Sequence, residues 1–294
     1  MFKPKLLVVP VDFSERGMAT AEHALAMAKS FGSKLIFVHV VPRAPFEYAA
    51  FEGGAYTGAF WPKEEEVEAS ARRMMDSFVE KLAPQVQVEK LILMGDPTAK
   101  IEELTNDRRA DLVLISTHGY GTFRRFVLGS VTAKLLHDLD CPVFTGTHIP
   151  EIPAYDPRPY QRIACAVDLG EQSESLLRWA WDLAQACKAN FSVIHAAPSI
   201  ELGGTYGDWF PVDARDVLVN SATERLKKLM AKVGCQGDVQ IDSAHAVPYV
   251  SRMTAESKAD ALVIGRSPKE GLLGRLRTHA YAIIREAPCP VISV

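Results

Sequence analysis

The feature that most constrains this sequence is an internal repeat: the two halves of the 294-residue chain carry the same pattern. The segment Leu6–Ser14 (LLVVPVDFS) corresponds to Ile163–Gly170 (IACAVDLG), which places Asp12 against Asp168, 156 residues later. A repeat of this length predicts two similar domains, each large enough to bury a core of its own. Further matches pair His39 with His195 and the Cys-Pro-Val tripeptide at Cys141 with that at Cys289.

Each half alternates short β-branched runs with longer helical patterns. Between two of the first half's runs, a stripe of apolar residues recurs every three or four positions and predicts one buried helix face, formed by Val67, Ala71, Met74, Phe78 and Leu82. Such alternation predicts an α/β fold in which helices cover a parallel sheet. We expect strands near residues 5–11, 34–41, 86–93, 111–116 and 142–145.

A proline-rich segment, Ile149–Tyr160, lies between the two halves. Four prolines in twelve residues are incompatible with a helix and favour a stiff, extended connector. We therefore expect a first domain over residues 1–148, a linker over 149–160 and a second domain over 161–294.

Charge and composition exclude several classes of function. The net charge of −3 and the isoelectric point near 6.3 give no electrostatic basis for binding nucleic acid or an anionic membrane. The first apolar run, Leu6–Val11, is too short for a secretory signal or a membrane span. The five cysteines are scattered without a Cys-x-x-Cys pair, so we expect buried thiols in a cytoplasmic protein.

Small and polar residues follow the first and fourth expected strands. In an open parallel sheet, ligands bind beyond the carboxyl ends of the strands, at the point where the strand order reverses. These positions are therefore candidates for a binding site. They are Pro10, Val11, Asp12 and Ser14 after the first strand, and Ser116, His118, Gly119, Gly129, Ser130, Val131 and Thr132 after the fourth.

The segment after the fourth strand has the features of an anion site. Gly119 can adopt positive φ, which lets backbone amides approach a bulky anion. Gly129 and Ser130 would open a helix whose first amides lack partners within the helix and whose dipole favours a phosphate. The hydroxyls of Ser130 and Thr132 would add donors. In the alternative interpretation, Ser130 is an N-cap and the glycines are turn residues.

This segment resembles the nucleotide signature of the universal stress protein family, which is Gly, two residues, Gly, nine residues, Gly, then Ser or Thr. Here the signature stands as Ser116–Gly119, nine residues, Gly129 and Ser130. The first glycine is replaced by Ser116, which lowers the expected affinity without removing the site. The resemblance covers almost the whole chain in two copies, so the sequence is similar to a tandem universal stress protein.

The resemblance implies that each half is an open, five-stranded parallel α/β sandwich of the adenine nucleotide alpha hydrolase-like type. It implies a pseudo-dimer of the two halves joined through their last strands, with room for a further homodimer. The implied ligand is ATP, with Mg²⁺ bridging its phosphates and no metal site built by the protein. Asp12 would approach the adenine or ribose, Val41 would line the adenine pocket, and Gly95 faces the same rim. The glycine loop and the serine at the helix start would hold the ribose and phosphates.

Two alternatives concern Asp12 and the second half. Asp12 could instead be the N-cap of the first helix, a role that Ser14 could also take. In the second half, Pro268 stands where Gly119 is expected and Arg277 where Gly129 is expected. Either change hinders the close approach of backbone to a phosphate, so we expect this half to bind nucleotide weakly or not at all.

No catalytic residue is expected. Ser116 and His118 lie two residues apart without a third group to orient them, and no P-loop lysine follows a glycine run. His39 and His195 lie in apolar strands and are expected to be satisfied core residues. We therefore expect an ATP-binding stress-response switch that acts through occupancy. The alternatives are a slow ATP hydrolase and an interaction module that presents the aromatic residues of segments 42–62 and 198–211.

Overall fold

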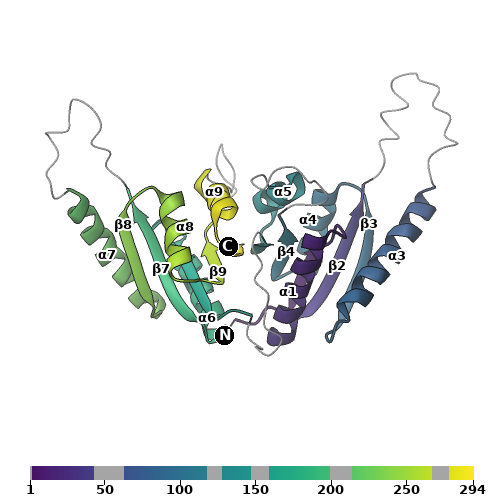
Figure 1. The fold of residues 1–294 in the computed structure, drawn as a ribbon, viewed down its shortest axis with the longest axis horizontal. Helices are drawn as coiled ribbons and strands as arrows, with labels where there is room; N and C mark the ends of the chain where they lie inside the picture. The colour runs from purple at the N-terminus through teal and green to yellow at the C-terminus, as the bar shows by residue number, and fades with distance from the viewer. Residues whose placement is uncertain (1, 43–62, 118–127, 147–158, 199–213, 267–277) are drawn as a thin grey trace, which may run out of the picture. The chain divides into compact units, whose positions relative to one another are not determined.

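The computed structural model describes residues 2–42, 63–117, 128–146, 159–198, 214–266 and 278–294. Its contacts divide the chain into two compact units. The amino-terminal unit comprises Pro4–Cys141, and the carboxyl-terminal unit comprises Pro142–Val294 together with Met1–Lys3. Each unit is an α/β structure with a predominantly parallel sheet, which confirms the predicted fold class (Figure 1).

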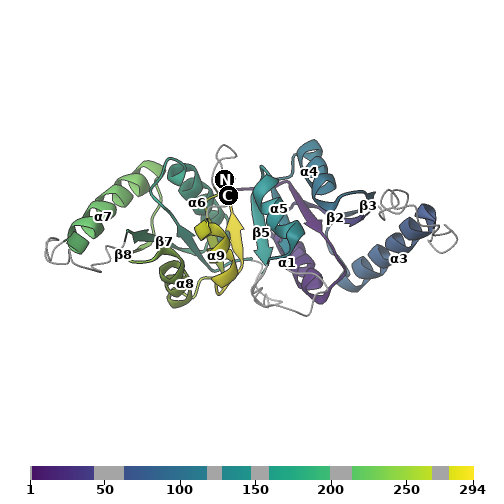
Figure 2. The ribbon, with the colours of Figure 1, turned by 90° about the horizontal axis from the view of Figure 1, so that it is seen from above.

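The amino-terminal unit has the strand order β3-β2-β1-β4, and its described strand pairs are parallel. Helices α1 and α3 pack together on one face, and α4 and α5 pack together on the other; Figure 2 shows α1 and α3 on the opposite side of β2 from α4. The expected strands are confirmed, with bounds that shift by one or two residues. The elements are β1 (Leu6–Pro10), α1 (Glu15–Phe31), β2 (Lys34–Val41), α3 (Glu64–Leu82), β3 (Val88–Met94), α4 (Pro97–Arg108), β4 (Leu112–Ser116) and α5 (Ser130–Asp138).

The carboxyl-terminal unit repeats this arrangement. Its strand order is β5-β10-β9-β6-β7-β8, with α6 and α7 on one face and α8 and α9 on the other (Figure 2). The elements are β5 (Val143–Gly146), β6 (Arg162–Ala166), α6 (Ser173–Cys187), β7 (Asn190–Ala197), α7 (Ala214–Val233), β8 (Asp238–Ser243), α8 (Ala246–Glu256), β9 (Ala261–Ile264), α9 (Thr278–Glu286) and β10 (Val291–Ser293).

Strand β5 comes from the first sequence repeat but groups with the carboxyl-terminal unit, because it pairs antiparallel with β10. The Thr145 hydroxyl donates to the Val291 carbonyl at 3.1 Å, and the Ser293 hydroxyl donates to the Val143 carbonyl at 3.2 Å. By these contacts the first unit ends at Cys141, and the sheet of the second unit is mixed; the expected domain bounds stay a prediction. The pseudo-dimer packing of the two halves stays a prediction.

The core consists of the strands and of one face of each helix. Strand β4 is buried along its whole length, as expected for a strand covered on both faces. In α3, the prediction that Met74 belongs to the core face was wrong: Met74 is 45% exposed, whereas Met75 is 1% exposed. The buried positions are Ala71, Met75 and Phe78, because a step of four residues followed by three keeps side chains on one face.

The cysteines are free thiols, and four of the five are buried. Burial raises the pKa of Cys289 to about 12, so this thiol is protonated and unreactive at neutral pH. This confirms the expectation of buried thiols. The expected linker falls largely outside the described residues, although Tyr160 at its end is buried.

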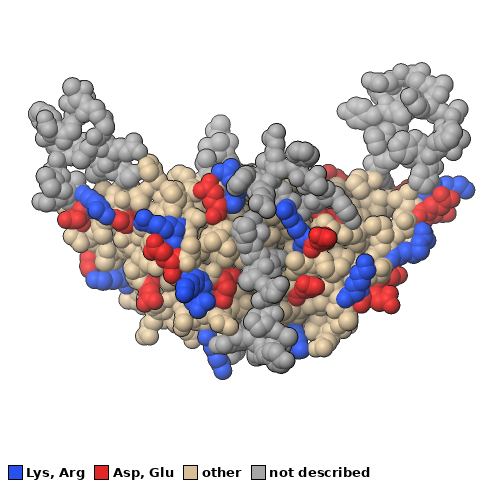
Figure 3. Space-filling model, in the orientation of Figure 1, with Lys and Arg blue, Asp and Glu red and all other residues tan. Residues whose placement is uncertain are grey.

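On the face shown in Figure 3, acidic and basic side chains of the described residues are interspersed over each unit. This mixture agrees with the small net charge of the whole chain. Among the described helices, none combines the length and the apolar composition needed to cross a bilayer.

Candidate functional site

The predicted site residues of the amino-terminal unit lie at the carboxyl ends of neighbouring strands. Strand β1 pairs with β2 on one side and with β4 on the other. The strand order therefore runs from β1 to β2 and β3 on one side, and then continues with β4 on the opposite side of β1. Pro10 ends β1, Val41 ends β2 and Ser116 ends β4. The turns after β1 and β4 therefore flank the switch point where open α/β sheets bind ligands.

The turn between β1 and α1 is held by a carboxylate. Asp12 Oδ1 accepts hydrogen bonds from the Ser14 amide at 3.0 Å and from the Ser14 hydroxyl at 2.7 Å. The Ser14 Oγ in turn accepts from the Gly17 amide at 3.0 Å, which makes Ser14 the N-cap of α1. The alternative in which Asp12 is the N-cap was wrong. Asp12 instead fixes the residue that caps the helix.

Two residues of this turn were missed by sequence reasoning. Phe13 has φ of 61°, a left-handed conformation that is costly for a bulky residue and is found preferentially at functional turns. Gly17 lies under the Asp12 carboxylate, because a Cβ built on Gly17 would lie 2.5 Å from Asp12 Oδ1. The available sequence signal was a glycine in the first turn of a helix, where its low helix propensity needs an explanation.

His39 supports the same turn from the neighbouring strand. Its Nδ1 lies 2.8 Å from the carbonyl oxygen of Val11. Since a carbonyl can only accept, Nδ1 carries the proton in this contact. The imidazole also packs against the Phe13 ring, with centroids 4.5 Å apart. The expectation that His39 is a satisfied structural residue is confirmed, and its role is to hold the β1 turn in place.

The turn between β4 and α5 brings together Ser116 and the predicted helix start. The Gly129 amide donates to the Thr117 carbonyl at 2.9 Å, and the Thr132 hydroxyl donates to the Ser116 carbonyl at 2.9 Å. Gly129 is the N-cap of α5 and provides no side chain, so Ser130 is the first helical residue. The alternative in which Ser130 is the N-cap was therefore wrong.

This helix start presents backbone donors toward the rim. Within the described residues, no side chain caps α5, whereas Ser14 caps α1 and Asp96 caps α4. Ser130 is exposed, and Thr132 is buried with its hydroxyl proton already committed to Ser116. Thr132 therefore positions the turn, while the amides of the first turn and the Ser130 hydroxyl are the groups suited to an anion.

Gly129 is not required by the fold itself. Its φ of −58° and ψ of 149° are open to every residue type. A Cβ at this position would approach the Thr117 carbonyl oxygen to 3.5 Å, which is an ordinary van der Waals contact. Among the described residues, nothing excludes an alanine here, and the absence of a side chain leaves the approach to the α5 amides clear.

Val41 and Gly95 form the far side of the rim. The Gly95 amide donates to the Val41 carbonyl at 3.0 Å, and Gly95 has φ of 135°, which favours glycine. Val41 is buried. Asp96 caps α4 by accepting from the Ala99 amide at 2.9 Å and from the Thr98 hydroxyl, and these hydrogen bonds lower the pKa of Asp96. Gly95 and Asp96 thus have structural roles at this edge.

Several predicted residues fall outside the described part of the chain. His118 and Gly119 lie there, as do most residues of the aromatic segments 42–62 and 198–211. Of the predicted site residues, the structure therefore places Ser116 and Gly129–Thr132 around one turn, and Pro10–Ser14 at the neighbouring strand end.

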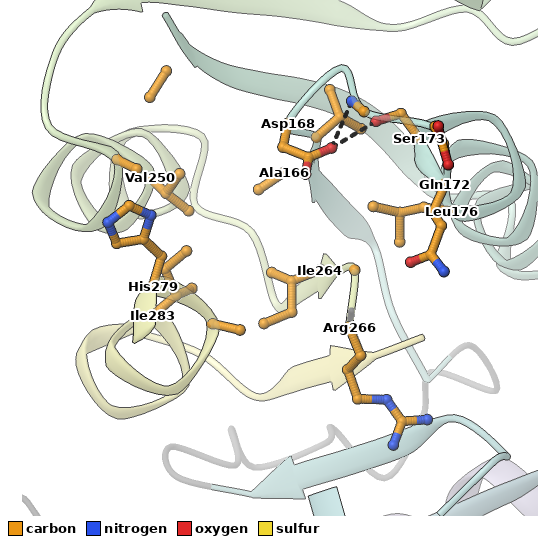
Figure 4. A pocket seen from close by; sticks show the side chains of 17 residues that line it. Ala166, Asp168, Gln172, Ser173, Leu176, Val250, Ile264, Arg266, His279 and Ile283 are labelled. Carbon is orange, nitrogen blue, oxygen red and sulfur yellow. Dashed lines mark hydrogen bonds between the residues drawn. The ribbon is translucent and has the colours of Figure 1, made fainter. Parts of the chain in front are cut away.

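The carboxyl-terminal unit repeats the β1 turn closely (Figure 4). Asp168 Oδ1 accepts from the Gly170 amide at 2.8 Å and from the Ser173 hydroxyl at 2.9 Å. Leu169 has φ of 58°, like Phe13. The Nδ1 of His195 lies 2.8 Å from the Val167 carbonyl, which confirms that His195 is also a satisfied structural residue. A cavity of about 570 Å³ opens beside this turn.

The turn after β9, which corresponds to the turn after β4, differs from it in sequence and in hydrogen bonding. By the alignment of β9 with β4 and of α9 with α5, Arg266 occupies the place of Thr117 and Ala280 that of Thr132. Ala280 has no hydroxyl to donate to the preceding strand end. The Arg266 side chain is 6% exposed and points away from Asp168 (Figure 4). The hydrogen bond that closes the first turn through Thr132 is thus lost in the second.

Comparisons with known proteins agree with this duplicated architecture. The universal stress protein MJ0531 of Methanocaldococcus jannaschii is 31% identical over 141 residues, covering 47% of this chain and 79% of that protein. The universal stress protein Rv2005c of Mycobacterium tuberculosis is 25% identical over 302 residues, covering 99% of this chain and 98% of that protein.

Solved structures show the same fold. The crystal structure of a universal stress protein from Archaeoglobus fulgidus covers 99% of this chain and 98% of that one, with 17% identity and a TM-score of 0.67. The model of the universal stress protein family matches residues 4–145 and again residues 159–294. With both sequence repeats matched by its model, the chain belongs to the universal stress protein family and carries two copies of the family's domain.

Proposed function

We propose that the amino-terminal unit binds ATP and that its occupancy switches the protein between states in a stress response. The proposal goes beyond family membership and places the nucleotide at the carboxyl ends of the strands in the amino-terminal unit. The phosphates would lie at the start of α5, and the adenosine would lie along the ends of β1 and β2. Mg²⁺, when bound, would neutralise phosphate charge and would be held through the phosphates themselves.

The observation that carries the proposal is the start of α5. A helix N-terminus with free amides and a favourable dipole attracts phosphate. Here the cap is Gly129, which has no side chain, although its backbone conformation does not require glycine. The described fold gives no reason for a glycine at this position. A ligand that approaches the backbone closely would give one. Ser130 adds an exposed hydroxyl at the same place.

The β1 turn supports the adenosine side. Asp12 is half-buried, and its position is fixed by Ser14 and by the absence of a side chain at Gly17. A carboxylate held at the end of a strand in this fold type can accept hydrogen bonds from ribose hydroxyls. Val41 supplies an apolar surface at the end of β2.

Occupancy, rather than turnover, is the proposed mode of action. The sequence has no lysine after a glycine run to activate phosphoryl transfer. A bound nucleotide shifts an equilibrium only to the extent that it prefers one conformation or association state over another. We therefore expect ATP hydrolysis slower than about one turnover per minute, far below typical enzymes.

Titration calorimetry with ATP and Mg²⁺ tests the proposal. The wild-type protein should bind, and Gly129→Val should weaken binding by at least about tenfold, because the branched side chain would block the approach to the α5 amides. Arg277→Val places the same side chain at the equivalent position of the second repeat and should leave ATP binding unchanged. A wild-type protein that does not bind ATP would refute the proposal.

A further inference from the structure

We propose that the cavity of the carboxyl-terminal unit is a separate binding site for an uncharged organic molecule with an apolar body, and not a second phosphate site. This inference goes beyond the proposed function and stands on a different cavity. Its volume of about 570 Å³ lies in the range of small-molecule pockets. The question is which ligand chemistry its walls accept.

The walls are part aliphatic and part polar, and the larger aliphatic side chains come from four elements. Leu176 lies on α6, Val250 on α8, Ile264 at the end of β9 and Ile283 on α9 (Figure 4). Alanines from β6, β7, α8 and α9 complete the lining, which leaves space for a ligand. An apolar body would gain free energy here by removing these surfaces from water.

The charges that line the cavity disfavour an anion. Among the described residues, the carboxylates of Asp168 and Glu171 line it. The one described guanidinium in the lining, that of Arg266, is buried and points away from Asp168. A phosphate placed beside Asp168 and Glu171 would meet like charge in a partly desolvated space, where repulsion is stronger than in water. A cation would have to leave water for aliphatic walls, which is also costly.

The helix start that favours a phosphate in the first unit is altered in the second. Pro268 and Arg277 replace the two glycines of the signature, and Ala280 replaces Thr132. The cavity therefore persists without the features that suit phosphate. Neutral polar groups remain at its edge in the side chains of Gln172, Ser173 and His279. These groups suit hydroxyls on an otherwise apolar ligand.

The test uses the full chain with Gly129→Val, so that the site of the amino-terminal unit is blocked. Matched probes share one apolar body and differ in the charge of the attached polar group: phenethyl alcohol, phenylacetate and phenethylamine, together with adenosine and adenosine monophosphate. Binding is followed by saturation-transfer NMR at up to about 1 mM ligand. The uncharged members should bind at least about tenfold more tightly than their charged partners.

Two variants locate the site. Ala280→Phe fills the cavity and should abolish binding of the uncharged probes, with circular dichroism and thermal unfolding showing that the fold is retained. Asp168→Asn keeps an acceptor for Gly170 and Ser173 but removes a charge, so it should bring the affinities of neutral and anionic probes closer together. The proposal is overturned if no uncharged probe binds, if a charged partner binds as well, or if Ala280→Phe leaves binding unchanged. ATP binding by wild type is measured separately, so either proposal can fail alone.

Discussion

The two units share one turn and differ in another. After the first strand, both have an aspartate that accepts from the amide two residues on, a non-glycine residue with φ near 60°, and a histidine that hydrogen-bonds the carbonyl of the residue following the strand. After the fourth, the first unit has a Gly cap and the Thr132 bond to Ser116, whereas the second has Ala280 and a buried Arg266. The shared turn is part of the fold. The turn that differs is the one proposed to hold the phosphates.

The largest expected effect concerns His23, a buried histidine of α1 that has no counterpart at the equivalent position of the second unit. His23 is 2% exposed and burial lowers its pKa to about 4, whereas Trp179 occupies the equivalent place in the second repeat. Below about pH 6.5 the unfolded chain binds a proton that the folded chain does not. The free energy of unfolding should therefore fall by about 1.4 kcal/mol per pH unit between about pH 6.5 and pH 4, or about 3 kcal/mol in total.

Urea unfolding at about pH 7 and about pH 5 measures this loss in the wild type and in His23→Phe. The variant keeps the carboxylates, whose contribution then cancels in the comparison. The loss should be smaller in the variant by about 2 kcal/mol. Equal losses in both proteins would show that His23 is protonated in the folded state.

The second prediction compares the two aspartates. Asp12→Asn should weaken ATP binding by about tenfold to a hundredfold, the value of a hydrogen bond to a charged group, whereas Asp168→Asn should leave it unchanged. Asparagine keeps an oxygen that can accept the hydrogen bonds of the turn. The turn should therefore stay folded in both variants, and a change in ATP binding reports the lost charge. Tighter ATP binding by Asp12→Asn would place the phosphates, rather than the ribose, beside this carboxylate.

The third prediction concerns the Thr132 hydroxyl, which donates to the Ser116 carbonyl in the first unit and has no counterpart at Ala280 in the second. Thr132→Val removes the donor to the buried Ser116 carbonyl and should lower the free energy of unfolding by about 1.5 kcal/mol. Ala280→Thr in the second unit should not raise it by a matching amount, because Ala280 is buried and an added hydroxyl gains stability only if it finds a hydrogen-bond acceptor. Denaturant unfolding measures both. If the two changes are equal, the Thr132 bond contributes nothing specific to the first unit.

The smallest expected effect on stability is at Gly17. Gly17→Ala should gain about 1 kcal/mol of helix propensity but displace the Asp12 carboxylate, whose hydrogen bonds to Ser14 are worth a similar amount. The free energy of unfolding should therefore change little, while ATP binding weakens. A stabilisation of about 1 kcal/mol with unchanged binding would show that the carboxylate moves aside at no cost.

Local patterns were enough to place most of the fold and part of the site. Strand positions followed from β-branched runs bounded by turn residues, and Pro10, Val41 and Ser116 do end their strands. The α3 stripe could not separate Met74 from Met75, since steps of three and four residues both continue a helix face and packing alone decides between them. The cap assignments of Asp12 and Ser130 failed for a related reason: neighbouring polar residues compete for one position, and backbone geometry selects among them.

By itself, the sequence determined that the chain is a duplicated α/β protein, which residues follow each strand, and that Pro268 and Arg277 replace Gly119 and Gly129 in the second copy. Only the tertiary structure decided that β5 pairs antiparallel with β10 at this register, that Gly17 makes room for Asp12, and that the Arg266 side chain points away from Asp168. The reason is that periodicity and residue preference act along the chain. The partner of a strand edge or of a buried polar atom depends instead on distances between segments that are far apart in sequence.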